Sequence, residues 1–165
     1  MIRVLNATEE WRALMGKPTQ DLHSNDIELI LRSFALLISG NNYAPKMVNF
    51  LNAFSYKTKQ FTEEENAYLE NLFMSFIDAC SSLGEKAFFR NNRFSKTLFE
   101  SVFVAACANA YKNKVTVSRK IDPASFDMLK EDKEFVSYLL SGSSSTDNIK
   151  GRINRAKQLI KFIEE

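Results

Sequence analysis

Few residues in this sequence are of types that do chemistry, and their spacing argues against an active site. The single histidine, His23, lies in a polar stretch before a predicted helix, which favours a surface histidine over a catalytic one. The acidic residues gather at 63–65 and 127–134, where helix capping and a solvated helix face account for them. A metal-dependent nuclease would instead need carboxylates that converge in one pocket.

The other common catalytic patterns are missing from the chain. No Cys/His spacing suits zinc, the 5 glycines are scattered rather than grouped in a phosphate-binding loop, and no Gly-x-Ser-x-Gly motif occurs. We therefore expect no enzyme activity, no cofactor, and no catalytic, cofactor-binding or metal-ligating residue.

Basic residues are unevenly distributed, although the formal net charge is only +2. Residues 62–84 hold five acids and no base, whereas residues 85–120 hold eight bases and two acids. Clustered cations follow nucleic-acid phosphates by counterion release, and phenylalanines interleaved with arginines are typical of single-strand stacking surfaces. The alternative is a solvated basic face over core phenylalanines. The expected nucleic-acid contacts are Lys86, Arg90, Arg93, Arg152 and Arg155.

Two further pairs of residues have structural interpretations. Glu28 and Arg32 are spaced i, i+4 and predict an ion pair on one helix turn. Cys80 and Cys107 lie among apolar helical neighbours, which predicts buried free thiols in a reducing compartment. The chain start resembles no signal peptide, and no apolar run approaches membrane-spanning length, so we expect a cytoplasmic protein without membrane contact.

Helical periodicity dominates the chain, and the residue totals fit a single domain. We predict an all-α fold over 1–165, with about seven helices in orthogonal multi-helical packing. Between Asp122 and a Ser/Gly linker at residues 140–146, the pattern fits one helix or two short helices bent near Asp132. Residues 112–120 predict an extended connection. The predicted helix-opening residues are Thr8, Asn25, Pro45, Thr62, Ser95, Asp122 and Thr146.

Residues 26–36, which read Asp-Ile-Glu-Leu-Ile-Leu-Arg-Ser-Phe-Ala-Leu, resemble a helix of the prokaryotic domain-of-unknown-function family 262. That family includes the Gmr-type, modification-dependent restriction nucleases and related phage-defence proteins. Further similar segments follow in the family's order over nearly the whole chain. They are Asn6 with residues 11–14, Tyr43 and Met47 with residues 50–52, residues 87–90, residues 93–95 with Phe99 and Glu100, and Arg152 and Ile153 with Ala156.

The sequence also departs from that family. Its nucleases carry an N-terminal ParB/sulfiredoxin-like domain with an Asp-Gly-Gln-Gln-Arg-type motif, and many carry a His-Asn-His-type nuclease domain. Neither motif occurs here, so the resemblance transfers no catalytic residue and implies a fragment or split portion of a larger nuclease. We expect a non-catalytic helical module of a DNA-defence protein that serves as scaffold or DNA-contact domain. The alternative is a protein–protein docking or oligomerisation module, whose partner is a catalytic domain, a subunit of the same system or a second copy.

Overall fold

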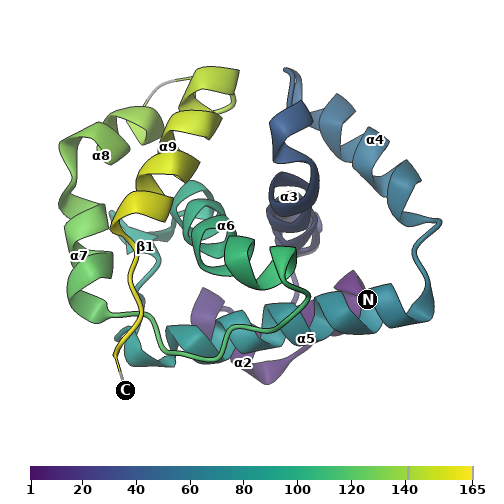
Figure 1. Ribbon diagram of the computed structural model, residues 1–165, viewed down its shortest axis with the longest axis horizontal. Coiled ribbons are helices and arrows are strands. Elements are labelled where there is room, and N and C mark those ends of the chain that lie inside the picture. Colours follow the sequence, from purple (N-terminus) through teal and green to yellow (C-terminus); the bar gives the residue numbers. More distant parts are fainter. Residues whose placement is uncertain (141, 165) are drawn as a thin grey trace.

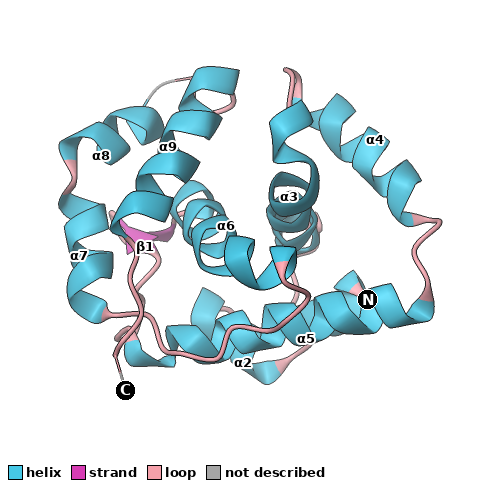
Figure 2. Ribbon diagram, in the orientation of Figure 1, coloured by secondary structure: helices cyan, strands magenta, loops and turns pink. Residues whose placement is uncertain are grey.

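The protein is described here by a computed structural model that covers residues 1–140 and 142–164 (Figures 1 and 2). Ser141, in the predicted linker, lies outside the described residues. The fold is predominantly α-helical, which confirms the predicted class. The helices are α1 (Ile2–Asn6), α2 (Glu9–Met15), α3 (Asn25–Ser39), α4 (Met47–Thr58), α5 (Glu63–Ala79), α6 (Lys96–Lys112), α7 (Pro123–Glu131), α8 (Lys133–Leu140) and α9 (Thr146–Leu159).

Several predicted helix starts are confirmed by the capping contacts. Thr62 and Glu65 form the expected capping box at the start of α5, in which each side chain satisfies the other residue's backbone N–H. The Ser95 and Asp122 side chains accept backbone N–H groups at the starts of α6 and α7. Asp132 separates α7 from α8, so the chain forms two short helices there.

Other starts lie one or two residues from the prediction. Ser24 rather than Asn25 is the N-cap of α3, α4 begins at Met47 after an extended Lys46, and Ser145 rather than Thr146 caps α9. The α5 helix ends at Ala79, and a short 3-10 turn, η2 (Cys80–Ser82), follows it. A second 3-10 turn, η1 (Gly40–Asn42), extends α3.

Two elements were missing from the prediction. The first is α1, which is too short to show helical periodicity. The second is a hairpin of two antiparallel strands, β1 (Phe89–Arg90) and β2 (Arg93–Phe94), which lies just before the predicted helix start at Ser95. Within the described ranges, nine α-helices and one small sheet are formed, against about seven helices expected.

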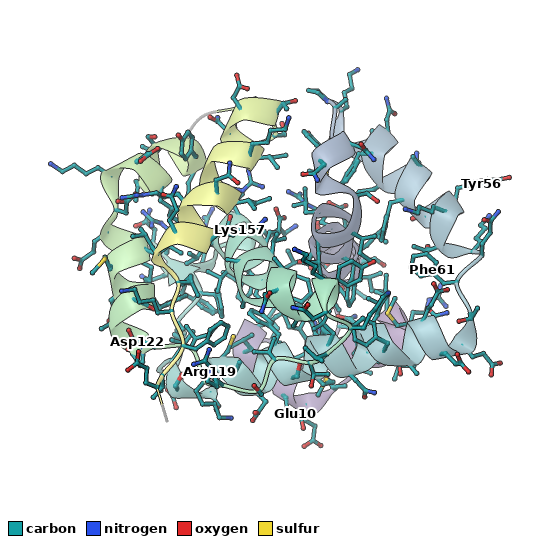
Figure 3. The ribbon with its side chains drawn as sticks, in the orientation of Figure 1. Glu10, Tyr56, Phe61, Arg119, Asp122 and Lys157 are labelled. Atoms are coloured by element: carbon teal, nitrogen blue, oxygen red, sulfur yellow. The ribbon has the colours of Figure 1, made fainter. Side chains whose placement is uncertain are left out.

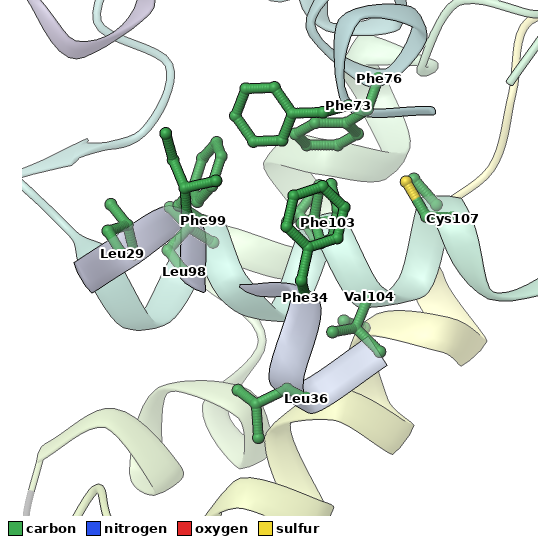
Figure 4. Close-up of a cluster of buried hydrophobic side chains, with 14 of the residues drawn as sticks. Leu29, Phe34, Leu36, Phe73, Phe76, Leu98, Phe99, Phe103, Val104 and Cys107 are labelled. Atoms are coloured by element: carbon green, nitrogen blue, oxygen red, sulfur yellow. The ribbon is translucent and has the colours of Figure 1, made fainter. Parts of the chain in front are cut away.

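The core is built around α6, whose apolar residues occur on all sides of the helix, as expected for a central helix. It packs against α3, α5 and α9. Figure 4 shows Phe34 of α3, Phe103 of α6 and the α5 pair Phe73 and Phe76 in one aromatic cluster, with Phe99 of α6 beside it. The Phe76 and Phe103 rings meet edge to face, with centroids 5.1 Å apart.

The C-terminal segment pairs with residues 120–122 through backbone hydrogen bonds. The backbone N–H of Asp122 donates to Lys161 at 2.9 Å, and that of Ile163 donates to Lys120 at 2.9 Å. Figure 1 shows these two extended segments side by side beneath α6 and α9. Lys112 is the last residue of α6, and residues 113–120 form the expected connection. The Ser75 side chain fixes it to α5 by accepting the Val117 N–H.

Candidate nucleic-acid interface

The hairpin is formed by the six residues Phe-Arg-Asn-Asn-Arg-Phe. Asn91 and Asn92 occupy its two-residue turn with φ of 50° and 60°, the pattern of a type I′ turn. Asparagine tolerates this left-handed region better than most side chains. The turn therefore places Arg90 directly opposite Arg93, and Phe89 directly opposite Phe94.

The facing arginines are electrostatically unfavourable for the isolated hairpin, because like charges at directly opposed positions repel. Within residues 1–140 and 142–164, neither Arg90 nor Arg93 forms an ion pair with an acid. Arg90 donates to the backbone carbonyl of Lys130 at 3.2 Å, and Arg93 is exposed. Lys86, just before β1, is also exposed. We refer to Lys86, Arg90 and Arg93 together as the hairpin cations.

A cleft of about 340 Å³ lies beside the hairpin. Its walls come from the end of α2, the start of α3, the hairpin and the start of α6. Phe89 and Phe94 contribute half-buried rings, with centroids 5.8 Å apart and planes at 84°. Arg93 and Lys96 contribute cations. The cleft therefore combines aromatic surface with positive charge.

Asp26 is a buried residue in the wall of this cleft and is paired with Arg12 at 2.9 Å. Arg12 also donates to the side chain of Asn6, which accepts the Trp11 indole N–H at 3.0 Å. Burial acts to raise the pKa of Asp26, but hydrogen bonds, led by the one from the Asp21 backbone N–H, lower it to about 2. The carboxylate is therefore ionised and neutralised by its own partners at neutral pH. These contacts hold α1, α2 and α3 together.

Arg152 differs from the expectation of a surface contact. It is fully buried on α9, where it donates to Glu100 at 2.9 Å and to the Ser143 carbonyl. Burial lowers the pKa of Arg152, and the Glu100 carboxylate opposes this shift. A buried guanidinium that is paired in this way cannot reach a phosphate, so Arg152 is removed from the interface.

The predicted pair of Glu28 and Arg32 is present, with 3.6 Å between its charged atoms. Arg32 lies closer to Glu100, at 2.8 Å, and so joins the same buried network as Arg152. Glu100, the shared partner of Arg32 and Arg152, was not predicted from the sequence. Its position between Phe99 and Val102, inside an apolar helix pattern, was the available signal.

Arg155, which lies on α9 like Arg152, is also paired with acids. It contacts both carboxylate oxygens of Asp132, at 2.9 and 2.6 Å, and lies 3.5 Å from Glu134. The hydrogen bond from Arg155 is the main cause that lowers the pKa of Asp132 to about 2. Arg155 therefore joins α9 to the α7–α8 junction. The five expected contact residues divide into three hairpin cations and two structural cations of α9.

The remaining reactive side chains lie apart from this region. Cys80 and Cys107 are free and buried, as expected, and His23 is exposed. In the described part of the chain, no three His, Cys, Asp or Glu residues are grouped so that they could hold a metal ion. Over the same residues, no helix has the length and apolar character needed to cross a bilayer.

The chain matches no protein-family model, no curated protein and no solved structure.

Proposed function

We propose that this chain is a non-catalytic helical module that contacts nucleic acid through the hairpin cations, as part of a prokaryotic DNA-defence protein. The observation that carries the contact is the opposed pair Arg90 and Arg93 on a tight turn without acidic partners among the described residues. An anion between the two guanidinium groups would relieve their repulsion, and a phosphate suits this position. The defence context rests on the family resemblance of the sequence.

The test is fluorescence-anisotropy titration of labelled duplex and single-stranded DNA at low and moderate salt. The variant combines Lys86→Glu with Arg93→Glu, because both side chains are exposed. Its affinity is expected to fall at least about 10-fold, and the slope of log affinity against log salt to decrease by about 2.

The matched control combines Lys57→Glu with Lys59→Glu at the end of α4, beside Tyr56, on the opposite side of the molecule from the hairpin (Figures 1 and 3). Both variants replace two cations by two acids, so they alter the net charge equally. The control is expected to bind like the wild type. Equal loss in both variants would indicate a non-specific charge effect and would contradict a hairpin interface.

A second candidate function, docking onto a protein partner, is favoured by a groove of about 520 Å³ between α2 and α5. Leu14, Met74, Ile77 and Leu83 contribute apolar lining to it. Sedimentation velocity over a concentration series tests self-association through this groove. Under this alternative the wild type associates and Met74→Glu does not. A wild type that stays monomeric at every concentration would exclude a second copy as the occupant.

A further inference from the structure

We infer that the cleft beside the hairpin holds one unpaired nucleobase of a single-stranded nucleic acid, while Arg93 and Lys96 hold the adjoining phosphate. This inference rests on the proposed function and deepens it, because it names the form of nucleic acid that the interface selects.

The size and walls of the cleft fit a planar aromatic group. Its volume of about 340 Å³ falls within the range of small-ligand sites. Phe89 and Phe94 line it with perpendicular rings, so a base that stacks on one ring meets the other edge-on. Both arrangements are favourable for aromatic pairs, and stacking on phenylalanine is common in single-strand binding.

Gly16 fixes the position of the Phe89 ring. It ends α2 in the left-handed region, with φ of 63°, and a Cβ atom there would lie 3.1 Å from Phe89 Cζ. The Phe89 ring therefore packs directly against the backbone at the end of α2, and this contact holds the ring in the wall of the cleft. The adjoining Phe94 ring is equally fixed, because it packs edge-on against the buried Trp11.

The charges of the cleft favour an anionic ligand. Its acids already have partners, since Asp26 pairs with Arg12 and Asp21 lies 3.8 Å from Lys17. Arg93 and Lys96 have no acidic partner among the described residues, and the Lys96 ammonium donates to the neutral Asn25 side chain at 3.2 Å.

The neighbouring helix end adds to this field. Lys96 begins α6, a 17-residue helix without an acid in its first turn, so the positive end of that helix is not offset there. A phosphate at the mouth would meet two cations while its base contacts the rings. Bases paired in a duplex are stacked on their neighbours and cannot enter, so the strand must be single or locally opened.

The experiment compares an oligothymidylate with an abasic strand of the same length and phosphate number, by anisotropy at low salt. Wild-type protein is expected to bind the oligothymidylate about 5-fold more tightly, because only that strand provides bases for stacking. Phe89→Leu keeps an apolar wall but removes the ring, so it should abolish this preference while its affinity for the abasic strand stays unchanged. Phe89→Tyr retains a ring and should retain the preference.

Each contrary result has a distinct meaning. Equal wild-type affinity for the two strands would overturn the base-binding cleft and leave the hairpin interface intact. Absence of binding to both strands and to duplex DNA would overturn the proposed function as well. A preference that survives in Phe89→Leu would place the base elsewhere. Free thymidine monophosphate that binds as tightly as the oligothymidylate would overturn the assignment to a strand.

Discussion

Glu100 is a fully buried carboxylate that holds together three helices distant in the sequence. It lies on α6 between Arg32 of α3 and Arg152 of α9. Removing charges from water is costly, and their mutual attraction offsets that cost only while every partner is present. Two hydrogen bonds attach the loop before α9 to this region. The Tyr43 hydroxyl donates to the Ser144 carbonyl, and Arg152 donates to the Ser143 carbonyl.

Glu100→Gln is therefore expected to lower the free energy of unfolding by about 3–5 kcal/mol, because it leaves Arg152 buried without its counter-charge. The matched control is Glu28→Gln. The Glu28 side chain is 49% exposed and pairs with the same Arg32, so its loss should cost less than about 1 kcal/mol. Urea denaturation followed by circular dichroism measures both. Similar costs for the two variants would show that burial of the network contributes little.

Asp26 gives the protein a predictable response to acid. Its pKa of about 2 in the folded state lies below the value of 3.8 for an unperturbed aspartate. The unfolded chain therefore binds the proton first as the pH falls. The stabilisation by the carboxylate is complete above about pH 4 and is lost progressively as the pH falls toward 2. The difference corresponds to about 2 kcal/mol.

We expect Asp26→Asn to be less stable than the wild type by about 2 kcal/mol at neutral pH, and the two proteins to converge near pH 2. Urea denaturation at a series of pH values measures this difference. The variant should keep part of the acid sensitivity, because Asp132 also has a pKa of about 2. A constant difference between the two proteins from neutral pH to pH 2 would show that Asp26 titrates normally.

At the scale of elements, the hairpin depends on two residues in an uncommon backbone region. Asn91 and Asn92 both have positive φ, which the type I′ turn requires and which glycine adopts without steric cost. Asparagine followed by asparagine between matching Arg and Phe residues was the signal for this turn. The turn fixes which side chains face each other, and hence the position of the candidate interface.

Asn91→Ala should destabilise the protein by about 1 kcal/mol, whereas Asn91→Gly should be neutral or slightly stabilising, since a Cβ atom is disfavoured at positive φ and asparagine is only partly tolerant of it. Thermal denaturation of the two variants measures the difference. The glycine variant should bind DNA like the wild type, because it preserves the hairpin. Equal stability of the two variants would mean that the turn is not held in this conformation.

At the scale of the whole molecule, the core shields both thiols. Cys80 and Cys107 are buried, and burial raises the pKa of each thiol well above its usual value. A protonated thiol away from solvent is unreactive toward disulfide reagents. Cys107 belongs to the central helix α6, so its exposure requires the core to open.

Both thiols should therefore react with an aromatic disulfide reagent only as fast as the folded protein opens. Absorbance at a series of urea concentrations measures the rate, which should rise as the free energy of unfolding falls. Fully denatured protein is the control, in which both thiols react at once. Immediate reaction of either thiol in the native protein would contradict the buried placement.

Local patterns in the chain were sufficient to predict the fold class and most of the helices. Helical spacing and capping residues act over a few neighbours, so Thr62 with Glu65, Ser95, and Asp122 with Pro123 each identified a start that the structure confirms. The pair of Glu28 and Arg32 was predictable for the same reason, because residues four apart meet on one helix face. Burial of the two cysteines followed from their apolar neighbours.

Which cations remain available to a ligand depends on long-range packing and was not predictable from local patterns. Arg93 and Arg152 are both arginines in basic stretches of the sequence. Arg93 is nevertheless exposed beside the hairpin turn, whereas Arg152 is buried against Glu100. The partner of Arg152 lies 52 residues away in the chain, beyond the reach of any local pattern. The cleft likewise joins α2, α3, α6 and the hairpin, whose approach depends on the packing of the core around α6. Such placements follow from the whole set of packed contacts, because a side chain's exposure depends on what distant segments cover it.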